Sequence, residues 1–266
     1  MHPLGWHTDL AVLRLGGSTV EDRGDHLVIT TPANPSYWWG NFLLVTDPEA
    51  VHDPARWLDA FEQQFPDAEH RAIGLVAEPA DPQAWLDLRL FLEYADVLVT
   101  HGPVAPGPLA DGYRVKILGD GDDWERSTRM RQLAFPTQDE FEAKVTETRI
   151  AIAPDGAETW FGAFLGDELA AELGIADCGD GVARYRSVVT HPDHRRRGLT
   201  RHLLAVAAAH ATERGASTVV IVADADTDAG RLYRSAGFSY DSTAYQASRV
   251  PQPPDPGRSD PVDHPA

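Results

Sequence analysis

The chain has 266 residues, of which 42% are hydrophobic, and it carries a formal net charge of −18 at pH 7. This length predicts one large domain or two modest ones, with enough apolar residues for buried cores. The acidic balance argues against binding to nucleic acid or to an anionic membrane, and weakly favours cationic partners. The single cysteine, Cys178, excludes an intramolecular disulfide and a cysteine-rich metal site.

Two absences bear on location. The sequence has no run of about eighteen apolar residues, the length that a membrane-spanning helix needs. Its first residues lack the basic segment followed by an apolar one that marks a secretory signal. We therefore expect a cytoplasmic protein.

The first hundred residues alternate between strand-like and helix-like segments. Before Gly24 only a short apolar piece, residues 10–15, stands out. The later patterns predict strands at 26–31, 37–46 (with a bulge at Gly40), 72–77 and 95–100, and helices at 54–65 and 82–91. The aromatic residues Tyr37, Trp38, Trp39 and Phe42 are predicted to lie in the core, because nothing near them has triad or metal spacing. The Pro- and Gly-rich stretch 101–112 is typical of a linker.

The pattern then starts again. We expect strands at 113–118, 159–165, 169–175, 182–190, 218–223 and 238–247, the second and third forming a hairpin around Gly166-Asp167. Helices are expected from Asp122 or Asp123 to about 134, at 138–149 (with Phe141 and Val145 on one face), from 198 to 211, and at 226–236. The tail 250–266 is rich in Pro and Asp and predicts disorder.

The most informative stretch is a basic turn between a strand and a helix. The strand breaks at His191-Pro192, and the turn and helix start comprise Arg195, Arg196, Arg197, Gly198, Leu199 and Thr200. A glycine turn that opens a helix presents unpartnered backbone N–H groups and the positive end of the helix dipole, which together bind an anion. The arginines add charge and bidentate hydrogen bonds. We therefore predict a pyrophosphate site, which is neither a Walker loop, since no Gly-Lys-Ser/Thr follows, nor a Rossmann turn.

This stretch resembles the GNAT acetyltransferase superfamily. The family's Arg/Gln-x-x-Gly-x-Gly/Ala signature corresponds to Arg195, Gly198 and Thr200. A second signature, Asn-x-x-Ala-x-x-Leu-Tyr-x-x-x-Gly-Phe, corresponds to Asp226, Ala229, Leu232, Tyr233, Gly237 and Phe238. Two coupled motifs at the expected separation are far more specific than either one alone.

The resemblance implies a fold and a cofactor. The fold is α/β (α+β), with a mixed central sheet flanked by helices, and the co-substrate is acetyl-CoA, with no metal. The family binds the pantetheine arm along the strand residues Val188, Val189 and Thr190, and the pyrophosphate at 195–200. Asp226 and Ala229 would also contact the cofactor, and the hydroxyl of Tyr233 would protonate the departing thiolate.

The sequence departs from the family pattern at three places. Thr200 replaces a small residue and either adds a hydroxyl contact or crowds the ligand. Asp226 replaces Asn, adds a negative charge and could simply cap a helix. Ile221 stands where one branch of the family carries a glutamate base. Glu172 on the preceding hairpin is the nearest candidate base, although an exposed strand carboxylate is the more ordinary interpretation of this residue.

Each candidate site has a plainer alternative. The basic turn could be a solvated helix start, and Tyr233 a core tyrosine. The acidic run 224–228 does not fit a calcium loop, because Ala229 and Ser235 stand where Gly and Glu are needed. His191 and His194 resemble a metal pair in spacing alone, with no third ligand apparent, so no metal site is predicted.

The two halves repeat the same order of elements, which predicts a degenerate GNAT-like domain at 1–108, a catalytic GNAT domain at 109–249 and the tail. An unrelated α/β domain is the alternative for the first half. The predicted activity is N-acetyl transfer from acetyl-CoA to a primary amine of a small molecule or peptide. A non-catalytic acyl-CoA-binding module is the alternative. No nucleic acid or membrane partner is expected, and a homodimer remains open.

Overall fold

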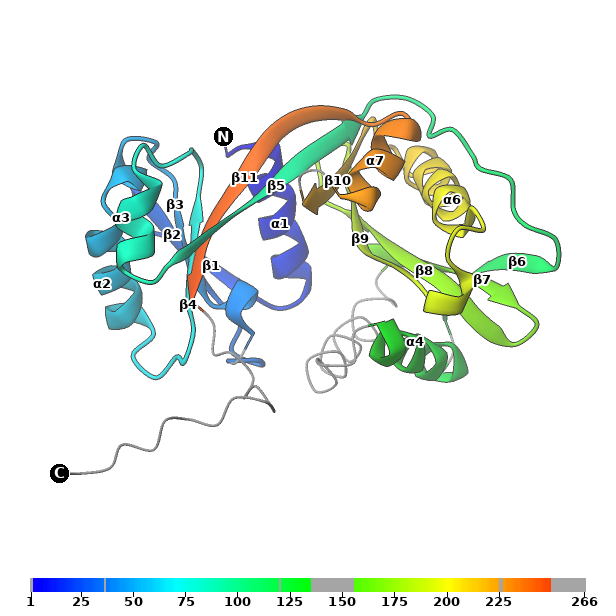
Figure 1. The fold of residues 1–266 in the computed structure, drawn as a ribbon, viewed down its shortest axis with the longest axis horizontal. Helices are drawn as coiled ribbons and strands as arrows, with labels where there is room; N and C mark the ends of the chain where they lie inside the picture. The colour runs from blue at the N-terminus through cyan, green and yellow to red at the C-terminus, as the bar shows by residue number, and fades with distance from the viewer. Residues whose placement is uncertain (1, 36, 120, 135–155, 225–226, 250–266) are drawn as a thin grey trace.

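The computed structural model describes residues 2–35, 37–119, 121–134, 156–224 and 227–249 (Figure 1). The predicted helix at 138–149, with Phe141 and Val145, and the predicted disordered tail at 250–266 lie outside these residues. Over the described residues, no helix combines the length and hydrophobicity that crossing a membrane requires.

Helices and strands alternate through both halves of the chain. The helices are α1 (Leu4–Leu15), α2 (Pro54–Gln64), α3 (Pro82–Asp87), α4 (Gly121–Ala134), α6 (Leu199–Glu213) and α7 (Asp228–Ser235). The strands of the first half are β1 (Thr19–Asp22), β2 (His26–Thr30), β3 (Phe42–Val45), β4 (Arg71–Leu75) and β5 (Phe91–Thr100). Those of the second half are β6 (Tyr113–Ile117), β7 (Glu158–Leu165), β8 (Glu168–Asp177), β9 (Val182–Thr190), β10 (Thr218–Asp224) and β11 (Ser239–Arg249).

All these strands form one mixed sheet in the order β1-β2-β3-β4-β11-β5-β10-β9-β8-β7-β6. The last strand of each half pairs with a strand of the other half: β5 pairs with β10, and β11 pairs with β4, both antiparallel. β5 and β11 also pair with each other at the centre, where they cross between the two lobes in opposite directions (Figure 1). Exchanging β1–β5 for β7–β11 gives the same order read from the opposite edge of the sheet, with β6 as an extra edge strand. The two halves are therefore topologically related by a pseudo-twofold arrangement.

The second half has helices on both faces of its sheet. α6 packs on one face and α4 on the other, with β8 between them (Figure 1). The apolar face of α6 presents Leu203, Leu204 and Ala207 to a core that includes Phe161 and Tyr185. This packing fixes the start of α6 relative to the end of β9.

The first half is built around α2. Asp53 caps this helix by accepting a hydrogen bond from the Arg56 backbone N–H at 3.1 Å, and Pro54 occupies the first turn, as is usual for a helix start. Trp57 and Phe61 are completely buried against β2–β4. The predicted spacing of apolar residues in this helix is therefore confirmed.

Phe61→Ala should destabilise the protein by about 3–5 kcal/mol, because a fully buried aromatic ring is removed and its neighbours relax only in part. The measurement is urea unfolding followed by circular dichroism, with the exposed Glu49→Ala as the control. A loss below about 1 kcal/mol would mean that the first half does not contribute a tightly packed core.

Several predicted boundaries were wrong for physical reasons. α1 and β1 were not predicted. The buried face of α1 includes Gly5, Trp6 and Thr8, and because two of these are not apolar, this face gives no regular hydrophobic pattern. The predicted strand at 37–46 is instead a 3-10 turn (Trp38–Gly40) followed by the short β3. The side chain of Asn41 holds this turn by donating to the backbone oxygens of Asn34 and Tyr37.

The other differences are smaller. α3 ends at Asp87 and β5 begins at Phe91, so the predicted helix at 82–91 is too long and the strand at 95–100 too short. Arg89 between them has a φ of 58°, which stops the helix. The hairpin β7–β8, the strand β9 and the helices α2 and α6 match the predicted order and closely match the predicted bounds.

Candidate functional site

The start of α6 has the geometry of an anion-binding turn. Gly198 is its N-cap, with a φ of +76° and no side chain to cap the helix. A Cβ at this position would lie 3.0 Å from the backbone oxygen of Pro108, so only glycine fits both the conformation and the space. Arg196 also has a positive φ, 60°, which is unusual for a residue with a side chain.

The backbone N–H groups at this turn are available. For residues 196–201 no hydrogen-bond acceptor is found among the described parts of the chain. The corresponding helix start of the first half differs, because the Asp53 carboxylate occupies the Arg56 N–H of α2. Of the two helix starts, therefore, the one at α6 is open to an anion.

Beside this turn the strands β9 and β10 separate. They are paired, in parallel, only from Val182↔Thr218 to Arg184↔Val220, whereas β9 continues to Thr190. Ser187 marks the change with a φ of +48°, at a register shift between β8 and β9. The β9 edge beyond Arg184 therefore has no strand partner on its β10 side within the described chain. Strained backbone of this kind is concentrated at functional sites.

The turn and the strand edge enclose one cavity of about 400 Å³. The structure brings together these predicted site residues: Val188, Val189, Thr190, Arg195, Arg196, Arg197, Gly198, Leu199, Thr200 and Ala229. Sequence reasoning missed further lining residues, namely His194, Arg201, Asp228 and Leu232 from the same region and Ala134 at the end of α4. Asp228, Ala229 and Leu232 lie at helical spacing, so the prediction of Ala229 could have been extended to the other two residues of α7 that line the cavity.

The side chain of Thr200 has a partner within the protein. Its hydroxyl lies 2.8 Å from the hydroxyl of Thr190, so it joins the start of α6 to the end of β9. A side chain held in this way braces the turn.

Thr200→Val keeps the shape of this side chain and removes the hydrogen bond. We expect a loss of about 0.5–1.5 kcal/mol in the free energy of unfolding, typical of one intramolecular hydrogen bond. The CoA dissociation constant should change by no more than a few fold. Urea unfolding and calorimetric titration with CoA measure the two quantities. A gain in CoA affinity would instead indicate that the hydroxyl crowds the ligand.

Tyr233 is less accessible than the sequence suggested. It is 6% exposed, packs against Phe238 with ring centroids 6.4 Å apart, and does not line the cavity that its neighbours Ala229 and Leu232 line. Burial raises the pKa of Tyr233 to about 12, so the expectation of a phenol with an ordinary pKa is wrong. Its hydroxyl makes no hydrogen bond to any described residue.

The second-motif residue Asp226 lies outside the described residues. α7 begins at Asp228, and its N-cap is Thr227, whose side chain accepts a hydrogen bond from the Gly230 N–H at 3.2 Å. The capping role considered for Asp226 therefore belongs to Thr227.

Glu172 is completely buried, which overturns its interpretation as an exposed strand carboxylate. It lies opposite Val189 in the β8–β9 ladder, and its carboxylate is 3.5 Å from Arg131 Nη1 of α4. The sequence could not predict this burial because the alternation along β8 is masked by apolar residues on both faces.

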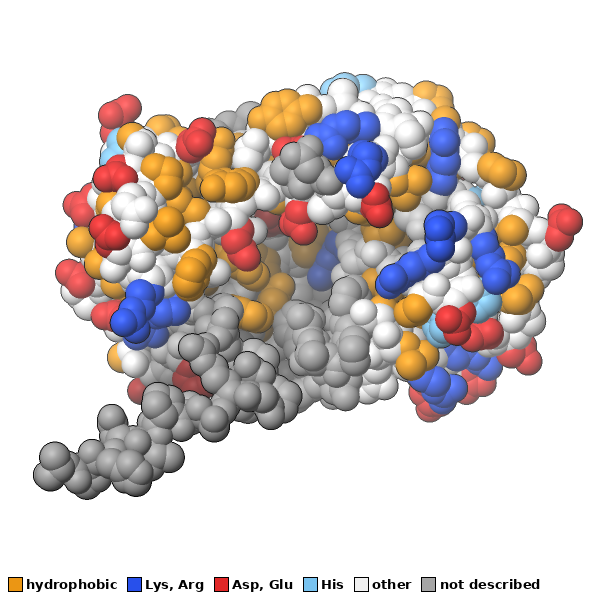
Figure 2. Space-filling model, in the orientation of Figure 1, with side chains coloured by type: hydrophobic (Ala, Val, Ile, Leu, Met, Phe, Trp, Pro, Cys, Tyr) orange, Lys and Arg blue, Asp and Glu red, His pale blue; other side chains and the backbone are white. Residues whose placement is uncertain are grey.

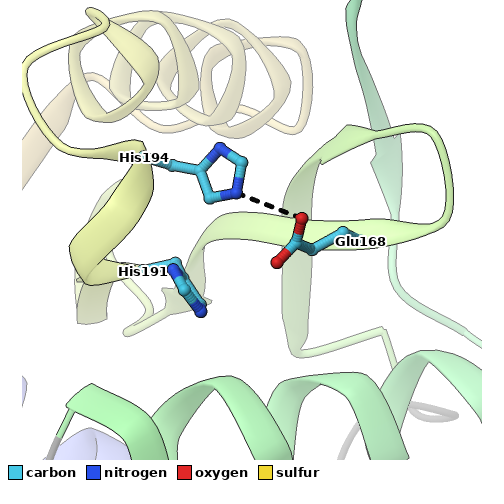
Figure 3. Close-up of side chains that lie close together, drawn as sticks. All are labelled: Glu168, His191 and His194. Carbon is cyan, nitrogen blue, oxygen red and sulfur yellow. Dashed lines mark ion pairs between the residues drawn. The ribbon is translucent and has the colours of Figure 1, made fainter.

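The pair His191 and His194 has a third neighbour that the sequence did not reveal. Glu168 of β8 lies with them, its carboxylate 3.3 Å from His194 Nε2 (Figure 3). Three ligand atoms within 4.8 Å of one another could in principle hold a metal ion.

Hydrogen bonds occupy Nδ1 of both imidazoles. Arg197 Nη1 donates to the Tyr113 hydroxyl, which lies 2.6 Å from His194 Nδ1 and has its own hydrogen available for it. His194 Nε2 lies 3.3 Å from the Glu168 carboxylate. His191 Nδ1 accepts from the Asp193 N–H at 3.2 Å. The network connects to the basic turn through Arg197, and the absence of a metal remains our prediction.

Comparisons with known proteins agree with this geometry. Residues 124–238 match the model of the acetyltransferase (GNAT) family. A functionally unknown conserved protein from Staphylococcus epidermidis has a TM-score of 0.72 at 13% identity, covering 86% of this chain and 92% of that one. A GCN5-related N-acetyltransferase from Kribbella flavida has a TM-score of 0.64 at 19% identity, covering 92% and 96%. No curated protein sequence matches the chain.

A further solved structure has the same two-part organisation. A tandem GNAT protein from the clavulanic acid biosynthesis pathway has a TM-score of 0.56 at 12% identity, covering 96% of this chain and 98% of that one. At these identities the solved structures establish the fold alone. The chain carries a GNAT acetyltransferase domain at residues 124–238, within a GNAT-type mixed sheet.

Proposed function

We propose that the protein is an N-acetyltransferase that moves an acetyl group from acetyl-CoA to a primary amine by direct attack. The observation that carries this proposal is the open turn at Gly198 beside the diverging strands β9 and β10. Free amides, three arginines and a helix N-terminus are suited to a pyrophosphate. The unpartnered edge of β9 is suited to an extended pantetheine arm.

The residues of this cavity have separate roles in the proposal. Residues 195–200 hold the pyrophosphate, while Val188, Val189 and Thr190 align the pantetheine. A backbone N–H of this strand donates to the thioester oxygen and stabilises the tetrahedral intermediate. Ala229 leaves room for the cofactor, and Asp226 is retained as a contact. Holding both reactants in place can contribute up to about 7–11 kcal/mol.

The proton balance assigns two further groups. As the amine nitrogen forms its bond to the acetyl carbon, it must lose a proton, and as the C–S bond breaks, the sulfur must gain one. Tyr233 supplies the proton to the sulfur. Glu172 is the candidate base, although its burial requires the proton to reach it along the gap between β9 and β10, through water or a neighbouring group.

The proposed organisation is a GNAT-like domain at 1–108 without a working site and a catalytic domain at 109–249. The capped start of α2, where Asp53 occupies the helix amides, supports the inactivity of the first half. The strand exchange between β5 and β11 supports an obligate pairing of the halves. We place the enzyme in the cytoplasm.

A non-catalytic acyl-CoA-binding module is the second candidate. It is favoured by the buried, weakly acidic phenol of Tyr233 and by the apolar Ile221 at the position of a family base. Such a module would bind CoA through the same turn without transferring the acetyl group.

Release of free thiol from acetyl-CoA in the presence of an amine library tests the proposal. The readout reports CoA, because burial raises the pKa of Cys178 to about 12 and keeps that thiol unreactive. Thiol release with at least one amine is expected. Tight CoA binding in calorimetry, with no turnover of any amine, would instead identify the binding module.

A further inference from the structure

A second cavity lies between the two halves, where the surface is hollowed (Figure 2). Its volume is about 360 Å³. It is lined by residues of α1, of the turn before β3, and of the central strands: Trp6, Asp9, Val12, Leu13, Tyr37, Trp39, Phe42, Arg184, Tyr185, Arg186, Ser187, Val222 and Gln246.

This cavity adjoins the proposed CoA cavity along a single strand. Residues 184–187 of β9 line the cavity between the halves, and residues 188–190 line the other. The boundary is the strained Ser187, where β9 has left β10. A molecule in the second cavity therefore lies next to the place where the pantetheine arm would end.

The wall from the first half is aromatic. Phe42 lies in the core, as predicted, and Trp39 packs against that core. Tyr37, Trp38 and Trp39 are only partly buried, and Tyr37 and Trp39 also line the cavity. Trp39 packs edge-on against Phe42, with ring centroids 5.5 Å apart, which fixes its orientation. This wall is suited to a planar or bulky apolar group.

Two arginines line the cavity, and they differ in how many of their N–H donors already have partners. Each nitrogen of the Arg184 guanidinium has a partner. Arg184 donates to Thr8 Oγ1 and to the backbone oxygen of Tyr185, and pairs with Asp9 at 3.0 Å. Arg186 donates through Nη1 to the buried Glu158 at 2.6 Å, and no second partner is found in the described chain. Its side chain is 20% exposed, so its remaining N–H donors border the cavity.

We propose that this cavity binds the acceptor, and that the acceptor is an amine that also carries a carboxylate and an aromatic or bulky apolar group, such as an aromatic amino acid. Arg186 binds the carboxylate, and Tyr37 and Trp39 contact the apolar group. This inference rests on the proposed N-acetyl transfer. It replaces the preference for cationic acceptors, because Arg186 has N–H donors beyond its pair with Glu158, whereas the lining carboxylate of Asp9 is paired with Arg184.

With this acceptor, the bonds, electrons and protons of the acetyl transfer balance. The α-amino nitrogen, deprotonated, attacks the acetyl carbon; the C–S bond breaks, and its electron pair goes to sulfur. One proton leaves the nitrogen and one is taken up by the thiolate, giving an N-acetylated amino acid and CoA. No oxidant, reductant or further substrate is needed.

The test compares matched acceptors in the thiol-release assay with the full chain. Tryptophan and phenylalanine should be acetylated with a kcat/KM about 10- to 100-fold above that of tryptamine and phenethylamine, which lack the carboxylate, since hydrogen bonds to charged groups contribute about 1.5–3 kcal/mol. Spermidine should be a poor acceptor. Equal or better turnover of tryptamine or spermidine overturns this inference while leaving N-acetyl transfer in place.

Arg186→Lys supplies the second arm. Lysine keeps a cationic partner for Glu158, but it loses the planar, bidentate donor set. It should raise the KM for tryptophan about tenfold and leave kcat/KM for tryptamine unchanged, whereas the surface change Arg23→Lys should alter neither. A variant with equal losses for both acceptors contradicts a role in carboxylate recognition.

Binding distinguishes the failure of this inference from the failure of the proposed function. Calorimetric titration with phenylalanine needs no turnover. If no amine releases thiol, Arg186-dependent phenylalanine binding still supports the cavity while the transferase proposal fails. If phenylalanine neither binds nor is acetylated, the inference is overturned.

Discussion

Replacing Gly198 by glutamate is expected to abolish CoA binding, with a rise of at least about 100-fold in the dissociation constant, or about 2.7 kcal/mol. The new carboxylate would stand among the amides that are proposed to hold the pyrophosphate, and like charges repel. The residue would also have to adopt the +76° φ of Gly198, with its Cβ 3.0 Å from the Pro108 oxygen. Calorimetric titration with CoA measures the effect.

Gly215→Glu is the matched control for this change. Gly215 follows the other end of α6 and has a φ of +100°, and a Cβ added there would meet open space. The variant should carry a similar backbone strain without touching the cavity, so CoA affinity should be retained. Unchanged affinity in Gly198→Glu would remove the anion-binding role from this turn. Loss of affinity in both variants would indicate a general effect on α6.

Replacing Tyr233 by phenylalanine is expected to lower kcat about 100-fold and to leave CoA affinity nearly unchanged. General acid catalysis contributes about 10²–10⁴-fold, and we expect the lower end because burial raises the pKa of Tyr233 to about 12. Transfer of its proton to a thiolate with a pKa of about 8.5 is uphill by roughly 5 kcal/mol before any help from the bound ligands. Steady-state kinetics and CoA titration separate the two effects.

The raised pKa of Tyr233 also predicts how the loss of activity in Tyr233→Phe depends on pH. Since burial raises the pKa of Tyr233 to about 12, the phenol stays protonated through neutral pH and loses its proton only as the pH approaches that value. The ratio of wild-type to Tyr233→Phe activity should therefore be constant between pH 7 and 9. Tyr245→Phe, on β11 and far from the cavity, should retain full activity. Wild-type turnover in Tyr233→Phe would rule out the acid role.

The glycine turn and the strand edge of the cofactor cavity could be predicted because the sequence patterns that mark them are local. A strand, a proline, a basic glycine turn and a helix follow one another within about twenty residues, and each affects its neighbours through backbone geometry. The residues of the interhalf cavity are far apart in sequence. Arg186 and Trp39 line one cavity because α1 and the turn before β3 lie against the centre of the sheet, and no sequence spacing encodes this arrangement.

The sequence by itself determined the order of most elements, the glycine turn at Gly198 and the family resemblance, because each depends on a run of consecutive residues. Only the tertiary structure decided the exchange of β5 and β11, the burial of Glu172 and Tyr233, and the position of Glu168 beside His194. These features depend on strand pairing across the chain and on packing against both faces of the sheet. A local pattern of apolar and polar residues contains neither.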